Sequence, residues 1–300
     1  MKIAALMLAL ALGQKIPSDP YVRSHVNAKD PSTQCLYWTV PKITYYQSSA
    51  GNPQTKPAGS EFDAIRRSFQ SWQAVFDRCG NLSFEDGGLV DDRTVGYDPK
   101  GENRNLVLFR TRTCSAVVPA GDPCDDDDSC ANAYDCWDGT AQTIAVTLTT
   151  YDEKSGIIYD SDIELNSPLF FFTTVDSPKC SPPDVPVSSN CVATDVQNTA
   201  THEIGHFIGL DHTSNPNSTM NTQAGLGETD KRTIDSGSQS YVCVAYPKGQ
   251  PSQACIHPTT DISLGNKSSA GCATAGAEAW LPALAGWALM LARRRRGARP

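Results

Sequence analysis

Three histidines and one glutamate lie in a short stretch of the sequence at spacings that suit a metal site. His202 and His206 are four residues apart, so on a helix they lie about one turn apart on the same face and can reach one cation together. Glu203 follows the first histidine and is placed beside the cation rather than on it. Gly209 can take a left-handed conformation that ends the helix, which lets His212 approach from another direction. Three neutral imidazoles leave a fourth position open for water, which is typical of a catalytic zinc site rather than a structural one.

The distribution of histidine and methionine supports this interpretation. The chain has five histidines, and three of them lie within residues 202–212. A bare H-E-x-x-H pattern occurs by chance in many helices, so the glycine and the third histidine at fixed offsets supply most of the specificity. Met220 is the only methionine outside the two chain ends, and it follows His212 by eight residues. Taken alone it would be a loop methionine that fills a gap. Its position predicts instead a turn that packs a thioether beneath the site.

Composition indicates an exported globular protein. The 300 residues are 39% hydrophobic and 19% charged, and the formal net charge is −8. An acidic chain without a lysine or arginine stripe argues against a nucleic-acid partner. Eleven cysteines are too many for a reducing cytosol, and ten of them lie between the chain ends. The chain contains no C-x-x-C pair, the pattern that would favour a cysteine metal cluster. We therefore expect up to five disulfides, whose connectivity the sequence leaves open.

Both ends of the sequence have the character of targeting segments. Lys2 precedes an apolar run that ends near Gly13, which predicts a signal peptide over residues 1–13 and export. Residues 248–271 have the composition of a linker. The tail, 272–300, begins at Cys272 and contains a short apolar stretch followed by four arginines. About 14 apolar residues would span roughly 20 Å as a helix, which is less than the ~30 Å core of a bilayer.

Hydrophobic periodicity places the elements that would position the histidines. Residues 14–34 are polar and form an N-terminal arm or a short pro-segment. A long amphipathic helix is expected from Ser60, with Ser60 as its cap, and Asp195 or Thr194 is expected to cap the histidine helix. Residues 121–138 form an irregular, cysteine-containing insertion. Strands are expected at 43–46, 82–84, 106–109, 143–149 and 157–166.

The motif and the order of the elements resemble the metzincin zinc peptidases, and within them the matrixin-like branch. The resemblance covers residues 35–247, the expected catalytic domain. It implies an α+β fold, in which a mixed five-stranded sheet and long helices enclose an active-site cleft along the edge strand, 143–149. It also implies one zinc ion on His202, His206 and His212, with Met220 as the Met-turn.

The sequence also departs from the matrixin pattern. No cysteine-switch segment precedes the domain, and we expect Cys79 to be disulfide-bonded. A second histidine zinc site is not expected, because only His25 and His257 remain. Calcium is a further hypothesis: Asp160, Asp162 and Glu164 share one strand face and offer hard oxygen ligands, as does an aspartate run at Asp122 and 125–128. Acidic runs are usually solvated surface, which is the competing interpretation.

Together these features predict a secreted or surface-attached zinc endopeptidase. Glu203 would act as general base toward a zinc-activated water, and proteins or peptides would be the substrates. The alternative is a non-catalytic, zinc-containing surface adhesion or binding module, in which Glu203 would have no task. The tail resembles the C-terminal sorting tags of myxobacterial surface proteins, which implies sorting machinery at the membrane, modification or cleavage near Cys272, and attachment at the cell surface or outer membrane. The oligomeric state is not predicted.

Overall fold

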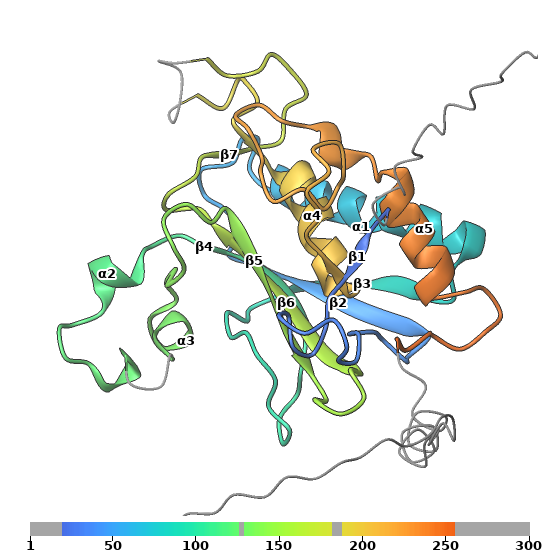
Figure 1. The fold of residues 1–300 in the computed structure, drawn as a ribbon. Coiled ribbons are helices and arrows are strands. Elements are labelled where there is room, and N and C mark those ends of the chain that lie inside the picture. The colour runs from blue at the N-terminus through green and yellow to red at the C-terminus, as the bar shows by residue number, and fades with distance from the viewer. Residues whose placement is uncertain (1–19, 126–128, 182–187, 256–300) are drawn as a thin grey trace, which may run out of the picture. The chain divides into compact units, whose positions relative to one another are not determined.

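The computed structural model describes residues 20–125, 129–181 and 188–255, all of which belong to one compact unit (Figure 1). The expected leader at 1–13, the tail at 272–300 with Cys272, and most of the expected linker lie outside the described residues. Among the described residues, no helix is both long and apolar enough to cross a bilayer.

Five strands form one mixed sheet. In chain order they are β2 (Lys42–Ser48), β3 (Ser83–Val90), β4 (Asn105–Arg110), β5 (Ala145–Tyr151) and β6 (Ile158–Asn166). Their order across the sheet is β3-β2-β4-β6-β5. Only β5 is antiparallel to its neighbour, and it is an edge strand. The expected mixed five-stranded sheet is therefore confirmed, and its edge strand is the segment expected to border the cleft.

The core lies between this sheet and three helices, α1 (Ser60–Cys79), α4 (Val196–Phe207) and α5 (Ser236–Ala245), which lie together on one side of the sheet in Figure 1. Phe69 of α1 stacks on Tyr45 of β2, with ring centroids 3.6 Å apart. Trp72 of the same helix is fully buried, and its indole N–H donates to the Thr201 carbonyl of α4 at 2.9 Å. Burial of these large aromatic faces, together with the indole bond, fixes α4 relative to the sheet.

Ser60 does not cap α1 as expected. Gly59 occupies the N-cap position with φ 83°, and no side chain caps the helix. Ser60 is the first helical residue, and its hydroxyl pairs with the Thr174 hydroxyl at 2.7 Å. The chain enters the helix through a left-handed residue, which glycine adopts readily, so the serine side chain points to a tertiary partner rather than to the helix N–H groups.

Two short ladders join distant segments. The N-terminal arm forms β1 (Val22–Arg23), which pairs antiparallel with β9 (Leu210–Asp211), directly before His212. The second ladder joins β7 (Phe172–Thr173) to β8 (Thr194–Asp195), directly before α4. Both ends of the histidine segment are thus held by backbone hydrogen bonds to residues far away in the sequence.

The ten body cysteines form five disulfides, as expected in number: Cys35–Cys255, Cys79–Cys243, Cys114–Cys136, Cys124–Cys130 and Cys180–Cys191. The bonded state expected for Cys79 is confirmed. Cys124–Cys130 lies within the expected insertion, 121–138, which contains the short helix α3 (Cys130–Tyr134). Cys114–Cys136 joins the insertion to the short helix α2 (Cys114–Val117), which precedes it.

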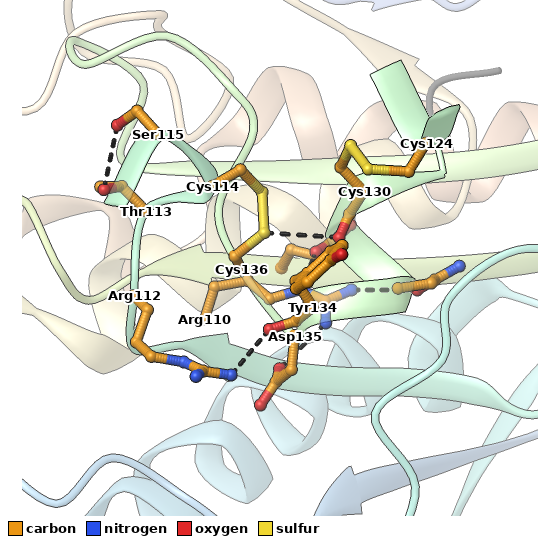
Figure 2. Close-up of a disulfide and its surroundings, with 12 residues drawn as sticks. Arg110, Arg112, Thr113, Cys114, Ser115, Cys124, Cys130, Tyr134, Asp135 and Cys136 are labelled. Atoms are coloured by element: carbon orange, nitrogen blue, oxygen red, sulfur yellow. Dashed lines mark hydrogen bonds and ion pairs between the residues drawn. A yellow bond between two sulfur atoms is a disulfide. The ribbon is translucent and has the colours of Figure 1, made fainter. Parts of the chain in front are cut away.

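Figure 2 shows how this insertion is attached to the sheet. Arg110, at the end of β4, is fully buried. Its guanidinium bonds the Glu164 carboxylate of β6 at 2.5 Å and the Asp135 carboxylate after α3 at 3.0 Å. A buried cation shared by two carboxylates ties the disulfide-bonded insertion to the centre of the sheet.

Candidate metal centre and cleft

The three histidines of the motif point their Nε2 atoms at one place. His202 and His206 project from α4, and His212 follows β9. The Nε2 atom of His212 lies 3.1 Å from that of His202 and 3.0 Å from that of His206. This trio is a group whose ligand atoms could hold a metal ion.

Backbone carbonyls set the tautomers of the two helical imidazoles. His202 Nδ1 lies 2.7 Å from the Thr219 carbonyl oxygen, and His206 Nδ1 lies 2.8 Å from that of Leu210. A carbonyl oxygen only accepts, so each Nδ1 carries a hydrogen and each Nε2 presents a lone pair. Burial lowers the pKa of all three histidines, and that of His202 well below its ordinary value, with His206 as an additional cause.

Facing lone pairs need a cation. With hydrogen on Nδ1, His202 and His206 have no proton to share between their Nε2 atoms. A hydrogen on His212 Nε2 would satisfy only one of its two short contacts, whereas a metal ion accounts for both. Ligands placed tetrahedrally at roughly 2.0–2.1 Å from zinc lie about 3.3 Å apart, close to the observed 3.0 and 3.1 Å. The residues present therefore fit zinc.

Local structure on both sides of the motif explains this convergence. Asp195 caps α4 by accepting from Asn198 N at 2.6 Å, one of the two caps expected. After the helix, Gly209 has φ 93°, and a β-carbon there would lie 2.4 Å from the Leu36 carbonyl oxygen. Only glycine fits this reversal, which sends the chain into β9 and brings His212 back toward the helix.

Met220 packs behind the histidine helix. Its side chain is 1% exposed. A β-carbon added to Gly205, which lies between the two helical ligands, would be 2.2 Å from the Met220 sulfur. The backbone before Met220 is fixed by Asp235, whose carboxylate accepts from Thr219 N at 2.9 Å. Because Thr219 also supplies the carbonyl that orients His202, the turn both supports α4 and sets one histidine tautomer.

Glu203 lies beside the histidines but does not belong to their trio. Glu203 is buried, with 5% of its surface exposed. Burial raises the pKa of its carboxyl to about 7, although the Thr147 hydroxyl acts in the opposite direction. Thr147 Oγ1 lies 2.7 Å from Glu203 Oε2. A carboxyl group in this environment can both accept and release a proton near neutral pH.

These side chains open into a cleft of about 870 Å³ that runs between β5, α4 and residues 221–225. A smaller cavity of about 200 Å³ continues from it. The two share Ile144, Phe170, Asn198, Thr199, Ala224 and Gly225. The cleft therefore extends beyond the histidines into a recess beside the segment that follows Met220.

Sequence reasoning missed two residues of this cleft, Thr147 and Lys231. Lys231 is buried, although the chain around it has no motif. Its ammonium group donates to the Gln223 carbonyl at 2.7 Å and pairs with Glu228. Thr147 is one of several threonines in β5, and the alternation of that strand predicted only the face on which it lies.

Asp160, Asp162 and Glu164 do not form one ligand group among the described residues, and residues 126–128 of the aspartate run lie outside them. Glu164 is bound by Arg110. Asp162 accepts from the Gly96 and Leu106 amides at 2.6 and 2.7 Å. Asp160 lies beside Asp162 and is buried, and its Oδ2 has no hydrogen-bond partner. Calcium remains a prediction, with Asp160 and Asp162 as its closest pair.

A second trio of potential ligands consists of His25, Cys35 and Cys255. Its two sulfur atoms are joined in a disulfide and are not available as thiolates.

Comparison with known protein families agrees with this geometry. The family model described as matrixin matches residues 128–240, a segment that includes β5, β6, α4, the three histidines and Met220. No curated protein matches the chain. The match and the mixed sheet confirm the resemblance to the matrixin-like metzincins, and they support a zinc metallopeptidase.

Proposed function

We propose that this chain is a matrixin-like metzincin and an exported zinc-dependent endopeptidase that hydrolyses peptide bonds in proteins. One observation carries the proposal: the Nε2 atoms of three imidazoles converge on a single point, and a buried carboxyl group lines the same cleft. His202, His206 and His212 would hold the zinc, and one position would stay open for reaction.

The cleft supplies the remaining parts of a hydrolysis site. Zinc, when bound, would polarise the scissile carbonyl and acidify a water molecule. Glu203 takes the proton of the attacking water and passes it to the leaving amine nitrogen, a role that suits a carboxyl with a pKa of about 7. The free edge of β5 pairs with the substrate as an extended strand, which aligns the scissile bond along the cleft.

Export and surface attachment belong to the same proposal. Five disulfides are consistent with an oxidising, extracellular environment. The leader at 1–13 would direct export. The tail from Cys272 would be recognised by sorting machinery at the membrane.

Casein zymography of the purified protein tests the activity. We expect clearing of the gel, loss of clearing with a zinc chelator, and recovery when zinc is restored. Metal analysis of the same sample should find about one zinc per chain. Zinc bound at this ratio without any cleavage of casein or other denatured proteins would instead favour the adhesion or binding module.

A further inference from the structure

The edge strand places a hydroxyl group on the carboxylate that the proposed function uses as its base. Thr147 lies in the middle of β5, and its backbone is paired with Ile163 of β6, which is fully buried. Its Oγ1 lies 2.7 Å from Glu203 Oε2 and 3.1 Å from the Glu203 carbonyl oxygen. Both oxygens only accept when the carboxyl is ionised, and the hydroxyl has a single hydrogen, so the shorter and charged contact, to Oε2, is the main hydrogen bond.

This hydrogen bond distinguishes the two carboxylate oxygens. Oε2 is held by the threonine, whereas Oε1 has no hydrogen-bond partner among the residues that the structure describes. Glu203 is on α4 and Thr147 is on the sheet, so the bond also links the helix of the metal ligands to the strand along which substrate would lie.

We infer that Thr147 is a positioning residue, whose hydroxyl fixes the Glu203 carboxylate so that Oε1 faces the water whose proton it accepts. The inference rests on the proposed function. A charged hydrogen bond from a side chain on a paired strand lowers the number of orientations that the carboxylate can adopt, and proton transfer depends strongly on such alignment.

The fold offers a matched pair of substitutions. Thr147→Val removes the hydroxyl at nearly constant volume and keeps a β-branched residue in the strand. Thr44→Val removes a hydroxyl that donates to the Glu85 carboxylate at 3.1 Å, on β2 of the same sheet and on the surface. Thr44 serves as the control because it makes the same kind of bond away from the cleft.

The test is steady-state hydrolysis of labelled casein by the full chain, with kcat and KM determined separately and zinc content measured for each variant. We expect kcat of Thr147→Val to fall on the order of tenfold or more, with KM and zinc content unchanged. Thr147→Ser should recover most of kcat, and Thr44→Val should match the wild type.

Any of three kinetic results would overturn the inference: kcat of Thr147→Val within twofold of wild type, an equal loss in Thr44→Val, or no recovery with serine. Loss of zinc from Thr147→Val would also overturn it, because the hydroxyl would then support the metal centre rather than the base. Failure of the proposed function is recognised separately, since the wild-type protein itself would then show no chelator-sensitive cleavage.

Discussion

Gly205 is the residue at which the packing beneath the metal centre leaves least room. A β-carbon there would lie 2.2 Å from the Met220 sulfur and 3.4 Å from the Trp72 ring, both in the core. Alanine is favoured over glycine within a helix by about 1 kcal/mol, but overpacking a buried site costs about 1–3 kcal/mol.

Because the β-carbon would lie only 2.2 Å from the Met220 sulfur, we expect the overpacking cost to be at the upper end of this range. Gly205→Ala should then lower the free energy of unfolding by about 1–2 kcal/mol, as measured by urea denaturation. Gly225→Ala is the control, because a β-carbon there would have no heavy atom within 4 Å. A Gly205→Ala protein that is as stable as the control, or more stable, would show that Met220 moves aside freely.

The buried pair Asp160 and Asp162 predicts a pH dependence of stability. Burial raises the pKa of Asp160 to about 6, and burial together with the neighbouring Asp160 raises that of Asp162 to about 8. Because these folded-state values exceed the unfolded value near 3.8, the stability they contribute is fully present below about pH 4 and is lost as the pH rises through 6 to 8.

Asp160→Asn removes one of the two like charges, so its stability relative to wild type should improve by about 1–2 kcal/mol between pH 5 and pH 9. Urea denaturation across this range, with calcium chelated, measures the difference. A difference that stays constant with pH would contradict the prediction. Added calcium that stabilises the wild type but not Asp160→Asn at pH 8 would support the calcium hypothesis.

The segment that follows Met220, residues 221–231, is held in place by an ion pair between Lys231 and Glu228. Lys231 bonds the Gln223 carbonyl and Glu228, and Glu228 accepts from Gly225 N at 3.0 Å. Lys231→Met leaves the Glu228 carboxylate without its cation. We expect a loss of about 3 kcal/mol in unfolding free energy and a several-fold rise in KM for casein, because this segment borders the cleft.

Lys248→Met is a suitable control for Lys231→Met, since the Lys248 side chain is exposed and its ammonium group donates to the Asp77 carbonyl rather than to a carboxylate. The double variant Lys231→Met with Glu228→Gln should regain part of the lost stability, because no unpaired charge remains. Equal effects of the two lysine substitutions would show that the ion pair does not hold the segment.

The sequence predicted the features that depend on residues close together in the chain, and it missed contacts between residues far apart. Strands β2, β4, β5 and β6 and helices α1 and α4 have a clear hydrophobic period, and His202 and His206 are related by helical geometry alone, so both were predictable. The mixed five-stranded sheet and its edge strand came from the resemblance to metzincins, whereas the full order of the strands was not predicted. Ser60 was assigned a wrong role because a left-handed Gly59 begins the helix, which no local pattern indicated.

Thr147 and Lys231 could not be predicted for a different reason. Thr147 meets Glu203 across 56 residues of sequence, and this contact depends on how α4 packs against β5. Lys231 would be assigned to the surface on its residue type, but the fold buries it against Glu228. Such contacts are determined by tertiary packing. The sequence therefore indicates the metal ligands of the cleft but not these two further residues that line it.

For the molecule as a whole, two disulfides join the first third of the chain to residues 243 and 255. Cys35–Cys255 and Cys79–Cys243 span 220 and 164 residues, whereas Cys124–Cys130 spans only 6. If a disulfide acts mainly by restricting the unfolded chain, the Cys79–Cys243 bridge contributes about 5 kcal/mol and the Cys124–Cys130 bridge about 2 kcal/mol.

The paired replacements Cys79→Ser/Cys243→Ser and Cys124→Ser/Cys130→Ser test this difference by denaturant unfolding. The first pair should be the more destabilising by roughly 3 kcal/mol. The opposite ranking would mean that the bridge in the insertion, rather than the bridge between α1 and α5, contributes more to global stability.

In the proposed mechanism three imidazoles hold the metal, and one carboxyl group moves the proton. The most direct measurement compares zinc content and casein hydrolysis in Glu203→Ala and in the wild type, on the same purified samples. We predict about one zinc per chain in both proteins and a loss of hydrolysis on the order of a thousandfold or more in the variant. A folded, zinc-loaded Glu203→Ala protein that still cleaves casein at the wild-type rate would contradict the account.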